Sequence, residues 1–308
     1  MIVTLTPNTA IDYTLKTPRF VLGETIRVVD SVWGMGGKAA DAAWILGKLG
    51  LPTIALGFAG GENGRRMEAM LHEHGVATDF VQVKGETRLN VVMVQPGQGQ
   101  STFTASSLEV TSKQSNELLG RFERSLTGAE CAIVGGSLPR GAPKDFYESA
   151  IQLAHSCQVP VIFDASGPAL ASGLAACPDL IKPNRVELEE LLGCAIHSIE
   201  EALQAANMLE ERSGAGVIVT MGAEGAAAVL RGEAYIISPL SVPIESTAGA
   251  GDGVLAGLAL AFYRKEPPEQ GLRYGFALAG AVLQTLATAD FNIQDYERLL
   301  LHVVIEKV

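Results

Sequence analysis

The chain has 308 residues, of which 47% are hydrophobic and 19% charged, and its formal net charge is −11. This apolar content suffices for a large core and excludes a disordered chain. The acidic balance argues against partners such as nucleic acid or an anionic membrane, because both need basic patches.

Strand-like and helix-like runs alternate through most of the chain. The expected strands are residues 2–5, 53–58, 131–135, 159–164, 180–182 and 216–220. The expected helices are residues 38–49, 64–74, 144–157, 185–192, 200–213 and 254–263. The strands are continuous apolar runs, which is typical of a parallel sheet covered by helices on both faces. We therefore predict an α/β fold of three layers, in which a mostly parallel sheet is flanked by helices.

Two segments interrupt this alternation. Residues 14–30 and 81–104 have β character without an intervening helix, and residues 95–99 resemble a hairpin turn. We interpret them as a small β-sheet lid, formed by about residues 13–30 and 81–106 of a single domain that covers residues 1–308. A plain edge extension of the main sheet is the alternative. Exposed β edges in the lid would favour a homodimer formed through it.

The stretch 246–253, STAGAGDG, precedes an apolar helix and carries the strongest chemical signal. Small residues let the backbone approach a ligand, and N–H groups at a helix N-terminus bind anions. A carboxylate at this position repels phosphate, so Asp252 makes most sense as a base that acts beside a transferring phosphoryl group. The alternative is an ordinary capped helix start in which Asp252 favours the helix dipole.

Other motifs surround this loop in a fixed order. They are Thr6-Pro7-Asn8 with Asp12, Gly36-Gly37-Lys38, Gly85-Glu86-Thr87-Arg88, Gly136-Ser137-Leu138-Pro139, Lys182-Pro183-Asn184-Arg185-Val186-Glu187 and Thr220-Met221-Gly222-Ala223-Glu224-Gly225. With them the chain resembles the ribokinase-like (PfkB) carbohydrate kinases over essentially its whole length. The details are most similar to the hexose-phosphate kinase branch, of the 1-phosphofructokinase and tagatose-6-phosphate kinase type.

The resemblance implies a set of catalytic and nucleotide-binding residues. Asp252 would be the catalytic base, and the anion hole would be formed by Gly249, Ala250 and Gly251. The element that organises ATP and Mg²⁺ in the family matches Asn184 and Glu187, with Glu187 acting on the metal indirectly. The rest of the nucleotide site would be Thr220, Gly222, Gly225 and Gly251. A helix-capping box at Asn184 and Glu187 is the alternative, and a requirement for K⁺ stays open.

The resemblance also implies a sugar site under the lid. Asp12 would accept hydrogen bonds from sugar hydroxyls, and a turn residue is the alternative. The other candidates for substrate hydroxyls or phosphate are Gly36, Gly37, Lys38, Asp41, Arg27, Arg88, Asn90 and Ser137. Arg88 offers the planar fork that suits phosphate, whereas surface ion pairs are an alternative for Arg27 and Lys38.

Asp41 departs from the family pattern, which has Asn at this position. An ionised Asp only accepts hydrogen bonds, and its charge disfavours a nearby phosphate. The prediction is ATP-dependent phosphorylation of a sugar phosphate. Two alternatives stay open: a kinase of a neutral sugar, amino sugar or nucleoside, and a non-catalytic sensor on the same fold.

The remaining features exclude other functions. The chain has no P-loop motif, no H-E-x-x-H motif and no G-x-S-x-G elbow. No run approaches the ~20 apolar residues that span a bilayer, and the N-terminus lacks a basic leader, so we expect a cytoplasmic protein. The four cysteines have no C-x-x-C spacing and are expected to be buried small hydrophobes.

Overall fold

The computed structural model describes residues 1–308 and is built on an 11-stranded sheet. Its parallel strands are, in spatial order, β12 (Gly216–Thr220), β11 (Leu180–Ile181), β10 (Val161–Asp164), β9 (Cys131–Gly135), β1 (Ile2–Thr6), β4 (Thr53–Ala59) and β5 (Ala77–Thr78). A further short strand, β6 (Val81–Gln82), also pairs with β4. Three antiparallel strands extend the sheet beyond β12, namely β13 (Ala226–Leu230), β14 (Glu233–Ile237) and β15 (Ile305–Lys307).

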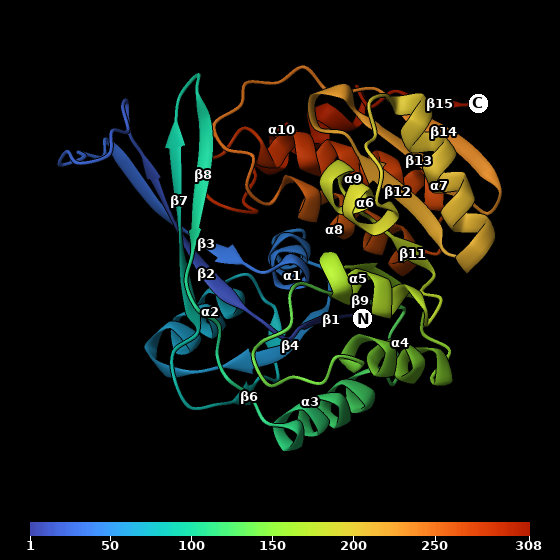
Figure 1. The fold of residues 1–308 in the computed structure, drawn as a ribbon, viewed down its shortest axis with the longest axis horizontal. Coiled ribbons are helices and arrows are strands. Elements are labelled where there is room, and N and C mark those ends of the chain that lie inside the picture. The colour runs from blue at the N-terminus through green and yellow to red at the C-terminus, as the bar shows by residue number, and fades with distance from the viewer.

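Helices cover both faces of this sheet. One face packs against α1 (Lys38–Lys48), α2 (Gly61–Glu73), α8 (Ala250–Arg264), α9 (Pro268–Val282) and α10 (Ile293–Leu300). The other face packs against α3 (Ser112–Ser125), α4 (Phe146–Ser156), α5 (Gly167–Leu174), α6 (Arg185–Leu192) and α7 (Ile199–Ser213). Successive strand residues such as Ile2 and Val3 point into opposite cores. The predicted three-layer α/β fold is therefore confirmed (Figure 1).

A second, four-stranded sheet projects from one side of the main body (Figure 1). Its strands are, in spatial order, β3 (Asp30–Gly36), β2 (Ala10–Lys16), β7 (Arg88–Gln95) and β8 (Gly99–Thr104). The small sheet was predicted, but its boundaries differ from the expected residues 13–30 and 81–106. Residues 17–29 form no strand, since Pro18 lacks an N–H donor and Gly23 turns the chain at φ 85°. Val81 and Gln82 pair instead with the main sheet.

Some local predictions were incomplete. Strand β13 was not predicted, because the alanine-rich run 226–230 has Val229 as its one β-branched residue. Strand β14 was also not predicted, although Tyr235, Ile236 and Ile237 are residue types that favour a strand. The prediction for the cysteines was wrong for three of them, since Cys131 is buried but Cys157, Cys177 and Cys194 are exposed. None of the helices combines the length and the apolar character that a membrane span requires.

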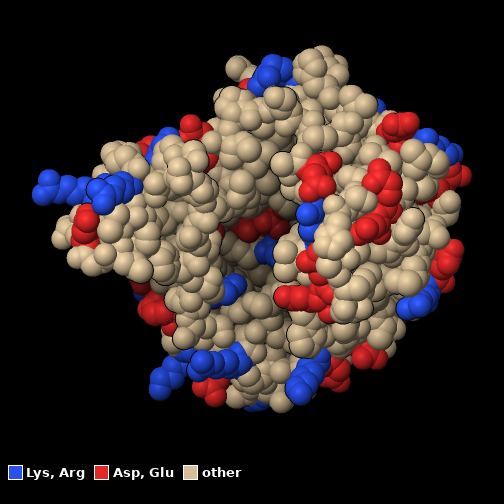
Figure 2. Space-filling view, turned by 45° about the horizontal axis from the view of Figure 1, so that its top comes forward, with Lys and Arg blue, Asp and Glu red and all other residues tan.

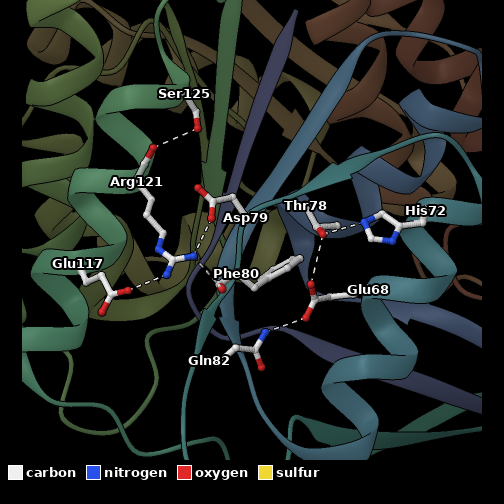
Figure 3. Close-up of polar contacts among 9 residues, drawn as sticks. All are labelled: Glu68, His72, Thr78, Asp79, Phe80, Gln82, Glu117, Arg121 and Ser125. Carbon is white, nitrogen blue, oxygen red and sulfur yellow. Dashed lines mark hydrogen bonds and ion pairs between the residues drawn. The ribbon is translucent and has the colours of Figure 1, made fainter.

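A network of hydrogen bonds and ion pairs joins the edge segment at residues 78–82 to helices α2 and α3 (Figure 3). Arg121 of α3 lies 2.6 Å from Oδ1 of Asp79 and 2.7 Å from Oε1 of Glu117, and it donates to the carbonyl of Phe80 at 3.1 Å. On the other side, Glu68 of α2 accepts hydrogen bonds from side chains on the same edge segment. The edge beyond β4 is thus held between two helices.

The substitution Arg121→Ala should lower the free energy of unfolding by about 1–2 kcal/mol, because one half-buried guanidinium joins three acceptors. Urea unfolding followed by circular dichroism measures this loss. The matched control is Arg124→Ala, since Arg124 lies one turn further along α3, is exposed and makes no ion pair. Equal stability of the two variants would contradict the role of Arg121.

Candidate active site

The candidate site lies at the carboxyl edge of the main sheet, where three neighbouring strands end in polar residues. Asp164 is the last residue of β10, Lys182 follows β11, and Thr220 ends β12. Ligands of open α/β sheets bind outside the carboxyl ends of the strands. Figure 2 shows a hollow in the surface, near the middle of the view, in which acidic and basic side chains meet.

Asp12 is fixed inside β2 of the small sheet and is not a turn residue. Its Oδ1 accepts from Nδ2 of Asn90, and its Oδ2 accepts from Oγ1 of Thr288, both at 2.9 Å. A Cβ atom at position 36 would lie 2.3 Å from Oδ1 of Asp12, so the observed position of the Asp12 side chain requires glycine at residue 36. Burial raises the pKa of Asp12, although Asn90, Thr288 and the charge of Arg88 oppose this.

Arg88 is the first residue of β7 in the small sheet, and its charge acts on Asp12 of the neighbouring strand β2. Its guanidinium donates to the carbonyl of Asn8 at 3.1 Å, while Nε has no partner. Asn8 in turn donates from Nδ2 to Oγ of Ser137 at 2.9 Å. Burial lowers the pKa of Arg88, but an arginine stays charged in proteins. Arg88 therefore provides a positive charge with unused donors next to Asp12.

A buried ion cluster forms the centre of the site. Nζ of Lys38 lies 2.6 Å from both Oδ1 of Asp164 and Oε1 of Glu187, and Nζ of Lys182 lies 3.1 Å from Oδ2 of Asp164. Burial would raise the pKa of Asp164, but Lys182 and Lys38 outweigh it and lower that pKa. Lys38, a predicted substrate ligand, is thus paired with two carboxylates in this structure.

Asn184 and Glu187 form a capping box at the start of α6. Oδ1 of Asn184 accepts from the backbone N–H of Glu187, and Oε2 of Glu187 accepts from that of Asn184, both at 2.9 Å. The backbone of Asn184 also pairs with Thr220. Gly222 and Gly225 follow in the turn after β12, with φ of 62° and 95°. Apart from Gly251, which lies at the start of α8, the expected nucleotide-binding residues therefore lie on two adjacent turns.

The loop before α8 presents donors to an anion. Gly249 caps the helix at φ 83°, and a Cβ atom there would lie 2.3 Å from the backbone nitrogen of Ala289. The N–H of Gly251 has no acceptor within the protein. A Cβ atom at Gly251 would lie 3.3 Å from Nζ of Lys182. A free N–H at a helix N-terminus next to an ammonium group is suited to binding phosphate.

Asp252 lies in the first turn of α8 and stays partly exposed. Burial raises its pKa to about 7, and the charge of Asp164 adds to this, whereas Lys182 and Lys38 oppose it. Asp41 lies in the first turn of α1, which packs against α8, and its carboxyl group hydrogen-bonds that of Asp252. A carboxylate with a pKa near the operating pH is suited to general-base catalysis.

The structure brings most of the expected residues together. Contacts or neighbouring positions in the chain connect Asp12, Gly36, Gly37, Lys38, Asp41, Arg88, Asn90, Ser137, Asn184, Glu187, Thr220, Gly222, Gly225, Gly249, Ala250, Gly251 and Asp252. Arg27 is the exception, because it lies on the exposed stretch between β2 and β3 and forms no ion pair with this set.

Sequence reasoning missed three side chains. Asp164 and Lys182 end or follow predicted strands, and a polar residue at the carboxyl end of a buried strand was the signal that could have found them. No sequence pattern near Thr288 indicated a site residue, because its partner Asp12 lies 276 residues away in the chain.

Comparison with known proteins agrees with this geometry. Residues 4–295 match the family described as pfkB family carbohydrate kinase. The 1-phosphofructokinase of Escherichia coli (strain K12) is 32% identical over 308 residues, covering 100% of this chain and 97% of that protein. The 1-phosphofructokinase of Borreliella burgdorferi is 31% identical, covering 100% of this chain and 99% of that protein.

Solved structures give the same relationship. Phosphofructokinase-2 from Escherichia coli in complex with potassium has a TM-score of 0.87 and 26% identity, covering 98% of each chain. Its tetrameric inhibited form also has a TM-score of 0.87, with the same 26% identity and 98% coverage of both chains. The chain belongs to the pfkB family of carbohydrate kinases and is an ATP-dependent sugar kinase.

The pKa of Asp252 predicts how the rate depends on pH. The base must be ionised to accept a proton, so kcat should be full above a pH of about 7 and be lost as the pH falls through it. Asp252→Asn should lower kcat by at least about 100-fold. Steady-state kinetics over a pH series checks both results, with the exposed Asp145→Asn as control. A variant that kept more than about a tenth of kcat would rule out Asp252 as the base.

Proposed function

We propose that this kinase transfers the γ-phosphoryl group of ATP to a hydroxyl of a sugar phosphate, as enzymes of the 1-phosphofructokinase, tagatose-6-phosphate kinase and 6-phosphofructokinase type do. The observation that carries the proposal is the position of Asp252, next to the free N–H of Gly251 and the ammonium group of Lys182. Asp252 takes the proton as the hydroxyl oxygen bonds to the γ-phosphorus. The bond from that phosphorus to ADP breaks, and ADP leaves.

The sugar is held from the small sheet. Asp12 and Asn90 form a fixed pair of hydroxyl ligands, and the absence of a side chain at Gly36 leaves room for the carboxylate of Asp12. The backbone at Gly36 and Gly37 is also proposed to contact the sugar. Arg88 binds the phosphate already present on the substrate, since its unused donors match phosphate oxygens. Ser137 completes the site through its hydrogen bond with Asn8.

The nucleotide lies along the turns after β11 and β12, beside Asn184, Thr220, Gly222 and Gly225. Glu187 already accepts from Lys38 and from the backbone of Asn184, but a carboxylate offers about four acceptor positions. It can therefore act on Mg²⁺ through water, which this ion retains readily. Mg²⁺ bound to ATP neutralises the phosphate oxygens during transfer. K⁺ is also part of the proposal, since the related phosphofructokinase-2 was solved in complex with potassium.

A kinase of a neutral or amino sugar is the second candidate. The pairing of Lys38 with Asp164 and Glu187 favours it, because Arg88 is then the one cation beside the sugar site that is not bound to a carboxylate. Both candidates use the same base and the same anion hole.

The small sheet acts as a lid in this proposal. In the structure, Oε1 of Gln100 on β8 accepts from Oγ of Ser246 at 3.1 Å and from the N–H of Thr247 at 2.8 Å. Lys16 at the end of β2 also pairs with Glu245. These contacts join the lid to the chain just before the anion hole and exclude water when closed.

The lid is also the proposed surface of a homodimer. Large apolar side chains are exposed on it and on the stretch between β2 and β3, namely Phe20, Leu22, Val28, Val29, Trp33 and Phe103. Such a concentration is typical of a protein interface, and a second copy of this chain is the proposed partner.

The substrate proposal is tested by ADP release with ATP and Mg²⁺ on fructose 6-phosphate, fructose 1-phosphate, tagatose 6-phosphate, fructose, ribose, glucosamine and adenosine. A ketose phosphate should be turned over best. For it, Arg88→Gln should raise KM by roughly 10- to 100-fold, because a charged hydrogen bond to phosphate is lost. The exposed Arg212→Gln on α7 is the control. Turnover of neutral compounds alone would favour the second candidate.

The dimer is tested by light scattering coupled to gel filtration. The wild-type chain should elute as a dimer, and Leu22→Asp with Val29→Asp should give a monomer, since two charges in an apolar interface are unpaired. Leu301→Asp is the matched control, because Leu301 is 84% exposed but lies outside the lid. A monomeric wild-type chain would refute this interface.

A further inference from the structure

Asp41 is an unusual member of the candidate site because it is a buried carboxyl group that forms no ion pair. The residue is only 4% exposed, and its Oδ1 is buried without a hydrogen-bond partner. An ionised carboxylate that is withdrawn from water with one oxygen unpaired is costly. The environment of Asp41 therefore favours a neutral group.

The groups that face Asp41 strengthen this effect. Asp252 approaches from α8 and Asp12 from β2, and both carry negative charge when ionised. Of the cations nearby, Lys38 and Lys182 bind Asp164, whereas the charge of Arg88 acts on both Asp12 and Asp41 without an ion pair to either. A backbone hydrogen bond from Gly37 and the N-terminus of α1 act in the opposite direction. Burial and two neighbouring carboxylates outweigh them and raise the pKa of Asp41 well above its ordinary value.

The surroundings also indicate which of the three carboxyl groups holds the proton. Asp12 accepts two hydrogen bonds and lies near Arg88, all of which favour its ionised form. Oδ1 of Asp41 is buried without a hydrogen-bond partner, so a negative charge is more costly on Asp41 than on either neighbour. Asp252 keeps partial exposure, whereas Asp41 does not. The proton therefore belongs to Asp41.

We propose that Asp41 is a neutral carboxylic acid in the working enzyme, and that it donates its proton in a hydrogen bond to Asp252. Asp41 is then a positioning residue, which orients the catalytic carboxylate and keeps it ionised. A neutral acid both donates and accepts hydrogen bonds, whereas an ionised one only accepts. This reverses the expectation that Asp41 adds a negative charge to the sugar site.

The protonation of Asp41 affects substrate choice, and this part rests on the proposed function. With Asp41 neutral, the site is one charge less negative, so a sugar phosphate held by Arg88 meets less repulsion. At alkaline pH Asp41 ionises, loses its donor and repels both Asp252 and an anionic substrate. The affinity for a sugar phosphate should therefore fall at alkaline pH.

The protonation state is tested directly by infrared spectroscopy of the full chain without substrate. At about pH 8 an ordinary aspartate is ionised, so a band from a protonated carboxyl group should be present in the wild type. Asp41→Asn should abolish this band, and the exposed Asp145→Asn should keep it. Absence of the band from the wild type, or its persistence in Asp41→Asn, would overturn the proposal. Because no substrate is added, this result is independent of the proposed function.

Kinetics provide the second test. The KM of the wild type for the best anionic substrate should rise by about tenfold or more at alkaline pH, where Asp41 ionises. Asp41→Asn keeps a donor and should abolish this rise, whereas Asp41→Ala should raise KM and lower kcat throughout the pH range. A KM for Asp41→Asn well below that of the wild type at neutral pH would show that Asp41 is ionised and would refute the proposal. If only neutral sugars are turned over, the infrared result still decides the protonation state.

Discussion

The buried carboxylate of Asp164 is the interaction on which the arrangement of the site depends. It ends β10 and binds one lysine from α1 and another from the turn after β11. Without the charge of Asp164, the ammonium groups of Lys38 and Lys182 would repel each other, and their side chains would turn away from the site. Because Asp164 holds both, Lys182 stays next to the loop before α8, and Lys38 joins α1 to the start of α6 through Glu187. A single strand-end residue thereby connects four separate elements.

The two sheets contribute different chemistry to the same hollow. The main sheet and its helices carry the proposed anion-binding loop and the proposed base, whereas the small sheet carries Asp12, Asn90 and Arg88. The connection between them is short, because only Gly37 separates β3 from α1. Asp41 follows within the first turn of that helix. A shift of the small sheet would therefore move Asp41, which lies next to the proposed base Asp252.

Much of this arrangement was predictable from the sequence, and the remainder has physical reasons. The continuous apolar runs at residues 131–135 and 216–220 predicted buried parallel strands, and the glycine-rich loop predicted the environment of Asp252. The partner of Lys38 was not predictable, because Asp164 and Glu187 lie 126 and 149 residues away. The neutral character of Asp41 also depends on burial and on neighbours from other elements, which no local pattern encodes.

The contacts of Gln100 with Ser246 and Thr247 bear on how such an enzyme treats water. Water is small enough to reach a γ-phosphate and is present at far higher concentration than any sugar. It cannot, however, touch Asp12 on the small sheet and Asp252 on α8 at once, as a polyol can. Only a molecule long enough to bridge the two sheets gains energy from bringing them together. The length of the substrate, rather than the reactivity of its hydroxyl group, then decides whether ATP reacts.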